Sequence, residues 1–457
     1  MVGVEIMKSA IVMAAGKGTR MKSEKTKTMH QVFDKPMIEH VYDNLKKAGV
    51  DHIVVVVGHG ADQIKDYLKD KVDYAMQMPQ LGTGHAVMQA ECLKGETGKT
   101  IIFNGDCPLV QPETIQKLFE KAKDAQFTLL TTVLDDALRY GRIIRDANDN
   151  VEKIVEFKDC NEQELQVKEI NVGIYCVDNE LLWKYLPELT NDNAQKEYYI
   201  TDLVEIFKKH GHTVNALIAE DSDEMIGVND RVMLDEAARW LKRHVNKNIM
   251  NSGVTLIDSE HTYISTDTVI GEDSVIYPNV YMEGHVTIGK NCTILPGTYL
   301  KNVVIGDGCK IDSSRITDTT VGNDVTIGPN SHLRNGCEIG DKVRIGNFVE
   351  MKNSKLGYNT KCAHLTYIGD TTVGDKVNFG CGVVTVNYDG KNKFRTEIGD
   401  GAFIGSNVNI IAPVKVGKNA LLAAGSTVYK DVEDGDMAIA RPRQEIKKGY
   451  GDKYKNK

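Results

Sequence analysis

The chain has 457 residues and a formal net charge of −8 at pH 7, so its length allows two or three domains and its acidic balance speaks against a nucleic-acid partner. It has no apolar stretch of about eighteen residues, and a transmembrane helix and a membrane partner are therefore not expected. The nine cysteines show no CxxC spacing typical of a zinc motif, nor a disulfide framework, which favours reduced thiols in the cytoplasm.

The N-terminal half alternates short apolar segments with a segment of helical spacing. The apolar segments are residues 9–14, 52–57 and 99–104, and the helical segment is 36–48, closed by Gly49. This alternation predicts a Rossmann-like α/β domain with a mostly parallel sheet and helices on both faces. Ligands of such sheets bind at the carboxyl ends of the strands. We therefore expect a site at residues 16–20 and at Asp106, which follow two of the apolar segments.

The loop that follows the first apolar segment reads Gly-x-Gly-Thr-Arg from Gly16 to Arg20. It matches neither GxxxxGK[ST] nor GxGxxG. Its backbone N–H groups, together with Lys17 and Arg20, suit a triphosphate. Asp106, at another strand end, suits Mg²⁺, although a helix cap or a turn is an equally good interpretation of this residue taken alone.

Residues 270–425 repeat an apolar residue followed by Gly, mostly at steps of six or a multiple of six. Examples are Ile270-Gly271, Ile288-Gly289 and Val321-Gly322. This hexapeptide period predicts a left-handed parallel β-helix. The apolar residue points inward, and Gly takes the turn because a Cβ would clash or strain the backbone. The segment 386–395 interrupts the repeat and predicts a projecting loop, which is either a binding face or a loop without function.

Several motifs occur in an order that resembles a known family. Those of the N-terminal half lie at residues 14–21, 27, 80–86, 105–106, 140–143, 154–156, 169–173, 197–202 and 227–229. They resemble sugar-phosphate nucleotidyltransferases. With the hexapeptide half attached, nearly the whole chain resembles the bacterial bifunctional N-acetylglucosamine-1-phosphate uridyltransferases/glucosamine-1-phosphate acetyltransferases. The resemblance implies a uridyltransferase domain over 1–230, a linker helix over 231–252 and an acetyltransferase β-helix over 253–457.

The resemblance implies two reactions that together make UDP-N-acetylglucosamine, a precursor of the cell wall. The C-terminal domain would transfer acetyl from acetyl-CoA to glucosamine-1-phosphate. The N-terminal domain would then transfer uridylyl from UTP to the product and release pyrophosphate, with Mg²⁺ as cofactor. The family also implies a homotrimer with the acetyltransferase site between subunits.

For the N-terminal site, the resemblance implies that Arg20 and Lys27 hold the triphosphate and stabilise the charge that develops on it. It implies that Asp106 and Asn229 hold Mg²⁺. Asn229 also precedes an amphipathic helix and is a candidate N-cap, a role that Asp230 can equally fill. Further UTP or UDP-sugar contacts are implied at Ala14, Ala15, Gly16, Lys17 and Gly18. The resemblance also implies that Gln77, Gly82 and Thr83 read uracil by hydrogen bonds, and that Gly141, Glu156 and Asn171 contact the amino sugar.

For the C-terminal site, the resemblance implies that His364 is the general base that takes the proton of the substrate amine. Glu350 would lie one coil away and orient the imidazole. A lone His in a coil is more often a structural or surface residue, and Lys352 and Arg334 have the plain alternative of being the solvated charged face of a coil. Glucosamine-1-phosphate contacts are implied at Arg334, Lys352, Tyr367, Asn378 and Lys393. Acetyl-CoA contacts are implied at Cys381, Asn387, Tyr388, Ser406, Ala424 and Arg441.

Two positions depart from the family pattern. Thr26 replaces the Pro that usually precedes the phosphate-binding Lys27, and we expect a looser triphosphate loop. Cys381 replaces the usual Ala, which should be tolerated if the backbone N–H alone stabilises the oxyanion. Asp202 and Glu205 form a capping-box pattern, so we interpret residues 198–202 as mainly structural.

Two other functions remain open at this point. One is a monofunctional sugar-1-phosphate nucleotidyltransferase with a structural β-helix. The other is a scaffold that keeps the fold with inactive sites.

Overall fold

The computed structural model describes residues 7–137, 140–193 and 195–455. The chain divides into two compact units, one ending at Leu241 and the other starting at Lys242, and the division falls within helix α7 (Arg231–Asn251). Each unit is built around buried apolar clusters of its own. Among the described residues, no helix combines the length and the apolar character that crossing a membrane requires.

The first unit contains, over its described residues, a nine-stranded sheet in the order β11-β7-β10-β6-β1-β4-β5, with the hairpin β8-β9 attached to β10. The expected mostly parallel core is present, because β6, β1, β4 and β5 run in the same direction, whereas β10 is antiparallel to β6 and β7. The strands are β1 Lys8–Met13, β4 His52–Val57, β5 Asp73–Met76, β6 Lys99–Asn104, β7 Phe127–Val133, β8 Arg142–Arg145, β9 Val151–Val155, β10 Glu169–Asp178 and β11 Val214–Ile218.

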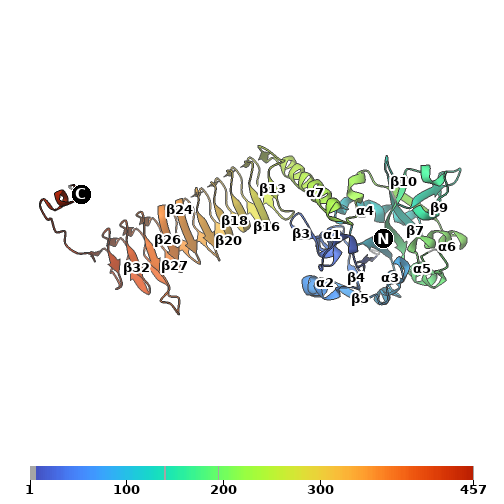
Figure 1. Ribbon diagram of the computed structural model, residues 1–457, viewed down its shortest axis with the longest axis horizontal. Coiled ribbons are helices and arrows are strands. Elements are labelled where there is room, and N and C mark those ends of the chain that lie inside the picture. Colours follow the sequence, from blue (N-terminus) through green and yellow to red (C-terminus); the bar gives the residue numbers. More distant parts are fainter. Residues whose placement is uncertain (1–6, 138–139, 194, 456–457) are drawn as a thin grey trace, which may run out of the picture. The chain divides into compact units, whose positions relative to one another are not determined.

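Helices cover both faces of this sheet because successive strand residues point to opposite sides. Ala10 and Val12 of β1 pack in one core with residues of α1, α2 and α4, whereas Ile11 packs in the other core with residues of α3, α5 and α6 (Figure 1). The helices are α1 Met37–Lys47, α2 Ala61–Leu68, α3 Thr83–Met88, α4 Pro112–Lys121, α5 Asn179–Tyr185 and α6 Leu203–Lys209. The predicted capping box before α6 is wrong, because the Asp202 carboxylate makes no capping hydrogen bond there.

The second unit is a left-handed parallel β-helix whose strands run from β12 (Thr255–Leu256) to β36 (Met437–Ala438), stacked coil on coil (Figure 1). Equivalent strands of successive coils pair in parallel register, so that Ile270 faces Ile288, Ile288 faces Ile305 and Ile305 faces Val321. All four side chains are at most 5% exposed. This inward ladder is the core that the hexapeptide period predicts.

Close packing between coils explains the repeated glycine. A Cβ on Gly271 would lie 2.7 Å from the carbonyl carbon of Gly289 in the next coil, which is too close for any side chain. The left-handed residue of the turn comes two positions later, at Asp273 (φ 60°). The predicted clash is therefore correct, but the left-handed backbone belongs to a polar residue, a conformation that Asp and Asn tolerate.

Candidate functional site

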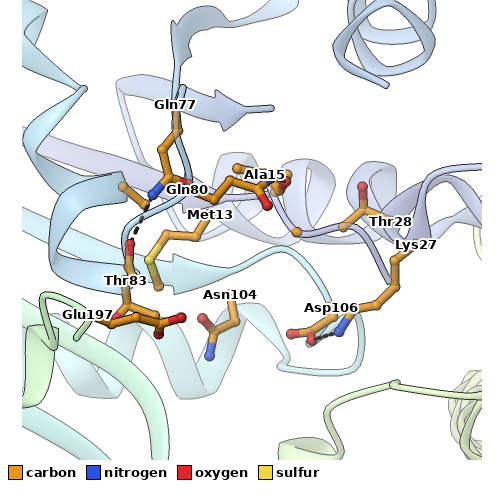
Figure 2. Close-up of a pocket in the computed structure, with 14 residues that line it drawn as sticks. Met13, Ala15, Lys27, Thr28, Gln77, Gln80, Thr83, Asn104, Asp106 and Glu197 are labelled. Atoms are coloured by element: carbon orange, nitrogen blue, oxygen red, sulfur yellow. Dashed lines mark hydrogen bonds and ion pairs between the residues drawn. The ribbon is translucent and has the colours of Figure 1, made fainter. Parts of the chain in front are cut away.

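The first unit has two adjoining cavities at the carboxyl ends of β1, β5 and β6. Their volumes are about 290 and about 250 Å³. Met13, Thr83, Asn104 and Glu197 line both of them, so the two cavities form one continuous cleft. Figure 2 shows the first cavity, with Lys27 and Asp106 directed at each other and with Gln77 and Gln80 on another segment. The cleft lies at the sheet edge where the sequence predicts a site.

Gly18 shapes the loop that follows β1. Its backbone is left-handed (φ 59°), and a Cβ there would lie 2.6 Å from the Cβ of Lys27. Any other residue would therefore displace Lys27. Residues 14–16 of this loop line the first cavity, as expected for nucleotide contacts, whereas the exposed Lys17 does not line it.

The predicted phosphate-binding cations and the predicted metal ligands form one cluster. Lys27 Nζ is paired with the Asp106 carboxylate and donates to Asn229 Oδ1 at 2.9 Å. Arg20 Nη2 donates to the same oxygen at 2.8 Å. Asn229 Nδ2 donates to the carbonyl of Gly227 at 3.0 Å, so its amide oxygen is turned toward the cations. A carboxylate and an amide oxygen directed at one cation are donors that Mg²⁺ prefers, and the residues present therefore fit this metal.

Asp230 caps α7 and leaves Asn229 available to the cluster. Its Oδ1 accepts the N–H groups of Val232 at 2.9 Å and Met233 at 3.0 Å. This is the usual way in which an Asp satisfies the first free N–H groups of a helix. The alternative in which Asn229 is the N-cap is therefore wrong.

The structure corrects the expectation of a looser loop at Thr26. This residue is 3% exposed, and its φ of −57° lies in the range that proline would impose. Its N–H donates to Gln63 Oε1 at 3.0 Å, and its hydroxyl donates to the same oxygen at 3.3 Å. Proline has no N–H to donate. The threonine thus replaces a covalent restriction of φ by two hydrogen bonds to α2.

The turn at residues 81–84 is hydrogen-bonded to the segment that begins at Glu197. Gly82 has φ 107° and ψ 176°, and a Cβ on it would lie 2.6 Å from the carbonyl oxygen of Tyr198. That oxygen accepts the N–H of Gly84 at 2.7 Å, and the N–H of Tyr198 donates to the carbonyl of Leu81 at 2.8 Å. This supports the structural role expected for residues 198–202.

The predicted uracil-reading residues lie together beside this turn. Gln77 is 4% exposed and donates from Nε2 to the carbonyl of Gly82 at 2.9 Å. Thr83 Oγ1 accepts the N–H of Ile200 at 3.1 Å. All three predicted positions line the first cavity, where these hydrogen bonds hold them in place.

The predicted sugar contacts are grouped at the second cavity. Glu156 and Asn171 line it, and the carbonyl of Gly141 accepts the N–H of Asn171 at 2.9 Å. Burial raises the pKa of the Glu156 carboxyl, and the nearby carboxylates of Asp159 and Asp202 raise it further. The second cavity is thus polar and adjoins the first cavity, which the predicted phosphate-binding Lys27 lines. A sugar phosphate requires this arrangement of a polar cavity beside a cation.

Four polar residues that line the first cavity were not predicted as site residues, although they lie within or beside the family motifs. They are Thr28, Gln80, Asn104 and Glu197. Gln80 and Glu197 begin the motifs 80–86 and 197–202, and Asn104 directly precedes Gly105. The available signal was their polar character within or beside these motifs.

In the second unit, the predicted base and most of the predicted coenzyme contacts share one corner of the β-helix. The coil register places His364, Cys381, Ser406 and Ala424 at equivalent positions of consecutive coils. Arg441 lies against the turn that follows Ala424. His364 and Cys381 are exposed. His364, Cys381, Ser406 and Ala424 thus form a continuous row on the surface, in which neighbouring members are at most 25 positions apart in sequence.

Cations gather on the strand face next to this corner. Lys352 of β24 (Arg344–Lys352) is in register with Arg334 of β22 (His332–Arg334). The neighbouring ammonium of Lys393 lowers the pKa of Lys352, and Arg334 contributes in the same direction. Arg334 is also paired with Glu350. Cations held this close favour a bound anion such as a phosphate.

The prediction that Glu350 lies beside His364 in the next coil is wrong for two residues of the same chain. Glu350 is in register with Tyr367, whereas His364 is in register with Asn347. Phe348, with φ 56°, lies between the two positions of β24 and turns the strand through the corner. His364 Nδ1 lies 3.4 Å from Asn347 Oδ1. The side chain that orients the imidazole in this chain is therefore Asn347.

The substrate residues predicted for the β-helix lie on two strand faces of one chain. Asn378 is in register with Lys361, which is in register with Arg344. Arg334 and Lys352 belong to the other end of the same coils, beyond the corner. One chain therefore does not bring Asn378 together with these cations.

The insertion at 386–395 forms the expected projecting loop between β29 (Val384–Val386) and β30 (Thr396–Ile398) (Figure 1). Tyr388 pairs with Lys393 across the loop. Asn387 donates to the carboxylate of Asp370, which also accepts from Asn353 at 2.6 Å. Asp370, 8% exposed, was not predicted as a supporting residue, although it lies only six positions after His364.

Comparisons with known proteins cover both units. The MobA-like NTP transferase domain family matches residues 10–145, and the bacterial transferase hexapeptide family (six repeats) matches residues 267–302, 318–353 and 395–430. The chain is 51% identical to the Bifunctional protein GlmU of Geobacillus sp. (strain WCH70) over 451 residues, which covers 98% of each chain.

Two further relatives with the same name show the same extent of similarity. The protein of Exiguobacterium sp. (strain ATCC BAA-1283 / AT1b) is 50% identical over 444 residues, covering 96% of this chain and 98% of the relative. The protein of Halalkalibacterium halodurans is 49% identical over 450 residues, covering 98% and 99%. Because the identity extends over nearly the full length of both units, the chain belongs to the GlmU family of bifunctional transferases, as its motifs predict.

Proposed function

We propose that this chain makes UDP-N-acetylglucosamine in two steps. The β-helix, residues 253–457, transfers acetyl from acetyl-CoA to glucosamine-1-phosphate. The α/β domain, residues 1–230, transfers uridylyl from UTP to the N-acetylated product and releases pyrophosphate. Residues 231–252 link the two domains. The free thiols of the chain favour a cytoplasmic location, because the cytoplasm keeps thiols reduced.

The observation that carries the uridylyl-transfer step is the cluster of Arg20, Lys27, Asp106 and Asn229. The sugar-phosphate oxygen attacks the α-phosphorus of UTP, and the bond to the pyrophosphate oxygen breaks. Arg20 and Lys27 neutralise the negative charge that develops on the phosphates. Asp106 and Asn229 would hold Mg²⁺, which supplies further charge neutralisation when bound.

The cleft provides places for the other parts of the two substrates. Gln77, Gly82 and Thr83 present polar groups for hydrogen bonds with uracil in the first cavity. Glu156 and Asn171 present polar groups for the amino sugar in the second cavity. Because the cavities adjoin, the two substrates can meet in line, and most of the rate acceleration is expected from this positioning.

For acetyl transfer, His364 takes a proton from the amine of glucosamine-1-phosphate while the amine nitrogen attacks the thioester carbonyl. The C–S bond then breaks, and coenzyme A leaves as the thiolate. An imidazole is suited to this task near neutral pH. Lys352, Lys393 and Arg334 bind the substrate phosphate, and the corner with Cys381 and Ser406 accommodates the thioester end of the coenzyme.

A homotrimer completes this second site. Asn378 lies on a different strand face of the chain from Arg334 and Lys352. The exposed His364 lies at the corner between the two faces. If both faces contribute to one site, they come from adjacent subunits. Size-exclusion chromatography with light scattering would test this, since a monomer with full acetyltransferase activity contradicts it.

Two variants of the full-length protein test the assignment of both sites. The purified chain is incubated with glucosamine-1-phosphate, acetyl-CoA and Mg²⁺ without UTP, and products are identified by mass. Asp106→Asn should still form N-acetylglucosamine-1-phosphate but should lose uridylyl transfer from UTP. His364→Ala should show the reverse. If the unaltered chain forms UDP-sugar from pre-acetylated substrate but never acetylates, the β-helix is an assembly module and the monofunctional alternative holds.

A further inference from the structure

A second cluster of ligand-type side chains lies at the opposite edge of the first unit's sheet. His52 and Asp73 are the first residues of β4 and β5, and Cys92 lies in the 3-10 helix η4 (Glu91–Leu93). One ligand atom from each of these residues lies within 4.8 Å of the other two. His52 Nε2 is 2.7 Å from Asp73 Oδ2. Imidazole, carboxylate and thiol thus converge from three separate segments of the chain.

A fourth residue orients the imidazole. Glu96 Oε1 lies 2.9 Å from His52 Nδ1, and its other oxygen, Oε2, accepts the hydroxyl of Ser9 at 3.0 Å. A carboxylate that accepts Nδ1–H leaves the other ring nitrogen, Nε2, facing Asp73, where it carries a proton until an ion takes that proton's place. This carboxylate–imidazole arrangement is the usual support of a metal-binding histidine.

The cluster is separate from the nucleotide cleft. His52 begins a six-residue strand whose other end lies beside the cleft, and a strand of this length spans about 20 Å. The Asp73 side chain is 64% exposed and that of His52 is 25% exposed, so an ion can reach the cluster from solvent. None of these residues serves in the reactions proposed above.

We propose that His52, Asp73 and Cys92 bind a divalent transition metal of the zinc class, with Glu96 positioning the imidazole. Nitrogen, oxygen and thiolate donors are the set that Zn²⁺ accepts, whereas Mg²⁺ requires oxygen ligands. Three protein ligands leave one tetrahedral position for water. The ion replaces the proton shared by His52 Nε2 and Asp73 and joins β4, β5 and the η4 turn.

Cobalt is the probe because thiolate coordination to Co²⁺ is visible in its spectrum. The full-length protein, freed of metals with a chelator, is titrated with Co²⁺ under reducing conditions. Excess Mg²⁺ occupies the oxygen site of Asp106 and Asn229. We expect visible d–d bands of tetrahedral Co²⁺ and a near-ultraviolet thiolate charge-transfer band, and bleaching of both by stoichiometric Zn²⁺.

Variants connect these bands to the cluster. Cys92→Ser should abolish the charge-transfer band, and Cys160→Ser, which alters another accessible thiol, should retain it. Glu96→Gln should weaken Co²⁺ binding about 10- to 100-fold. Unchanged uridylyl transfer by each variant shows that it is folded. Absence of the band in the unaltered chain, or its persistence in Cys92→Ser, would mean that the residues form a hydrogen-bonded ion-pair cluster only and would overturn the proposal.

Discussion

Replacement of Gly82 by alanine should disable the nucleotide cleft while leaving the β-helix intact. Gly82 has φ 107° and ψ 176°, a conformation essentially restricted to glycine. A Cβ at this position would lie 2.6 Å from the carbonyl oxygen of Tyr198 and 2.8 Å from its nitrogen. Both atoms belong to the backbone, so either the turn or the segment that begins at Glu197 must move.

The cost can be worked out from these contacts. Forcing a residue with a side chain into this backbone region costs about 1–3 kcal/mol. Displacing the Tyr198 carbonyl also breaks its hydrogen bond from the N–H of Gly84, which costs about 1 kcal/mol more. If the turn relaxes to avoid this cost, Gln77 and Thr83 lose their positions. A penalty of about 2–4 kcal/mol corresponds to a loss of about 30- to 1000-fold in kcat/KM for uridylyl transfer.

The assay measures pyrophosphate release from UTP and N-acetylglucosamine-1-phosphate, with acetyl transfer by the same preparation as the internal reference. Gly211→Ala is the matched control, because Gly211 also has a positive φ (79°) but an added Cβ would meet nothing within 4 Å. That variant should keep both activities. Wild-type uridylyl transfer by Gly82→Ala would refute the role assigned to the turn.

Three further changes have defined consequences. Gln63→Ala removes the acceptor of the buried Thr26 N–H, which should cost about 1–3 kcal/mol and raise the KM for UTP in steady-state kinetics. Burial, reinforced by a neighbouring carboxylate, raises the pKa of Asp202 to about 6, so the folded chain loses stability as the pH rises from about 4 to about 6. Asp202→Asn should therefore stabilise the chain by about 1 kcal/mol above pH 6, after allowance for solvent screening, as measured by urea unfolding. Lys393→Met removes the charge that lowers the pKa of Lys352, and should raise the KM for glucosamine-1-phosphate more than it lowers kcat.

Each of these predictions has its own control. Gln63→Glu keeps the acceptor oxygen but loses the amide N–H that donates to the carbonyl of Glu24 at 3.2 Å, so its defect should be smaller than that of Gln63→Ala; equal defects in both variants would contradict the hydrogen-bond argument. The gain from Asp202→Asn should vanish near pH 4, and a gain of the same size at pH 4 and pH 8 would exclude ionisation as its cause. Lys391→Met removes a charge from the same loop, and an equal effect there would show that overall charge matters, not the Lys352–Lys393 contact.

Where a local pattern is sufficient, sequence and structure agree closely. The strands at 52–57 and 99–104 begin and end where predicted, because an uninterrupted apolar run is bounded by residues that end strands. The β-helix follows from the hexapeptide period, since each coil repeats the same inward ladder.

Contacts between segments distant in sequence did not follow from such patterns. A spacing of fourteen residues suggested that Glu350 supports His364, but the left-handed Phe348 turns the strand and places them on opposite sides of a corner. The presence of Thr26 in place of proline predicted a loose loop. The prediction failed because the residue that holds Thr26, Gln63, lies in helix α2, 37 positions away in sequence.

The sequence by itself determined the architecture of two domains, the family and the position of the nucleotide site at the strand ends, because these depend on periodicity and on motifs within short segments. The tertiary structure alone decided which side chains meet: Lys27 with Asp106 and Asn229, and His52 with Asp73, Cys92 and Glu96. Such clusters depend on strand order and coil register, which bring residues tens or hundreds of positions apart within hydrogen-bond distance.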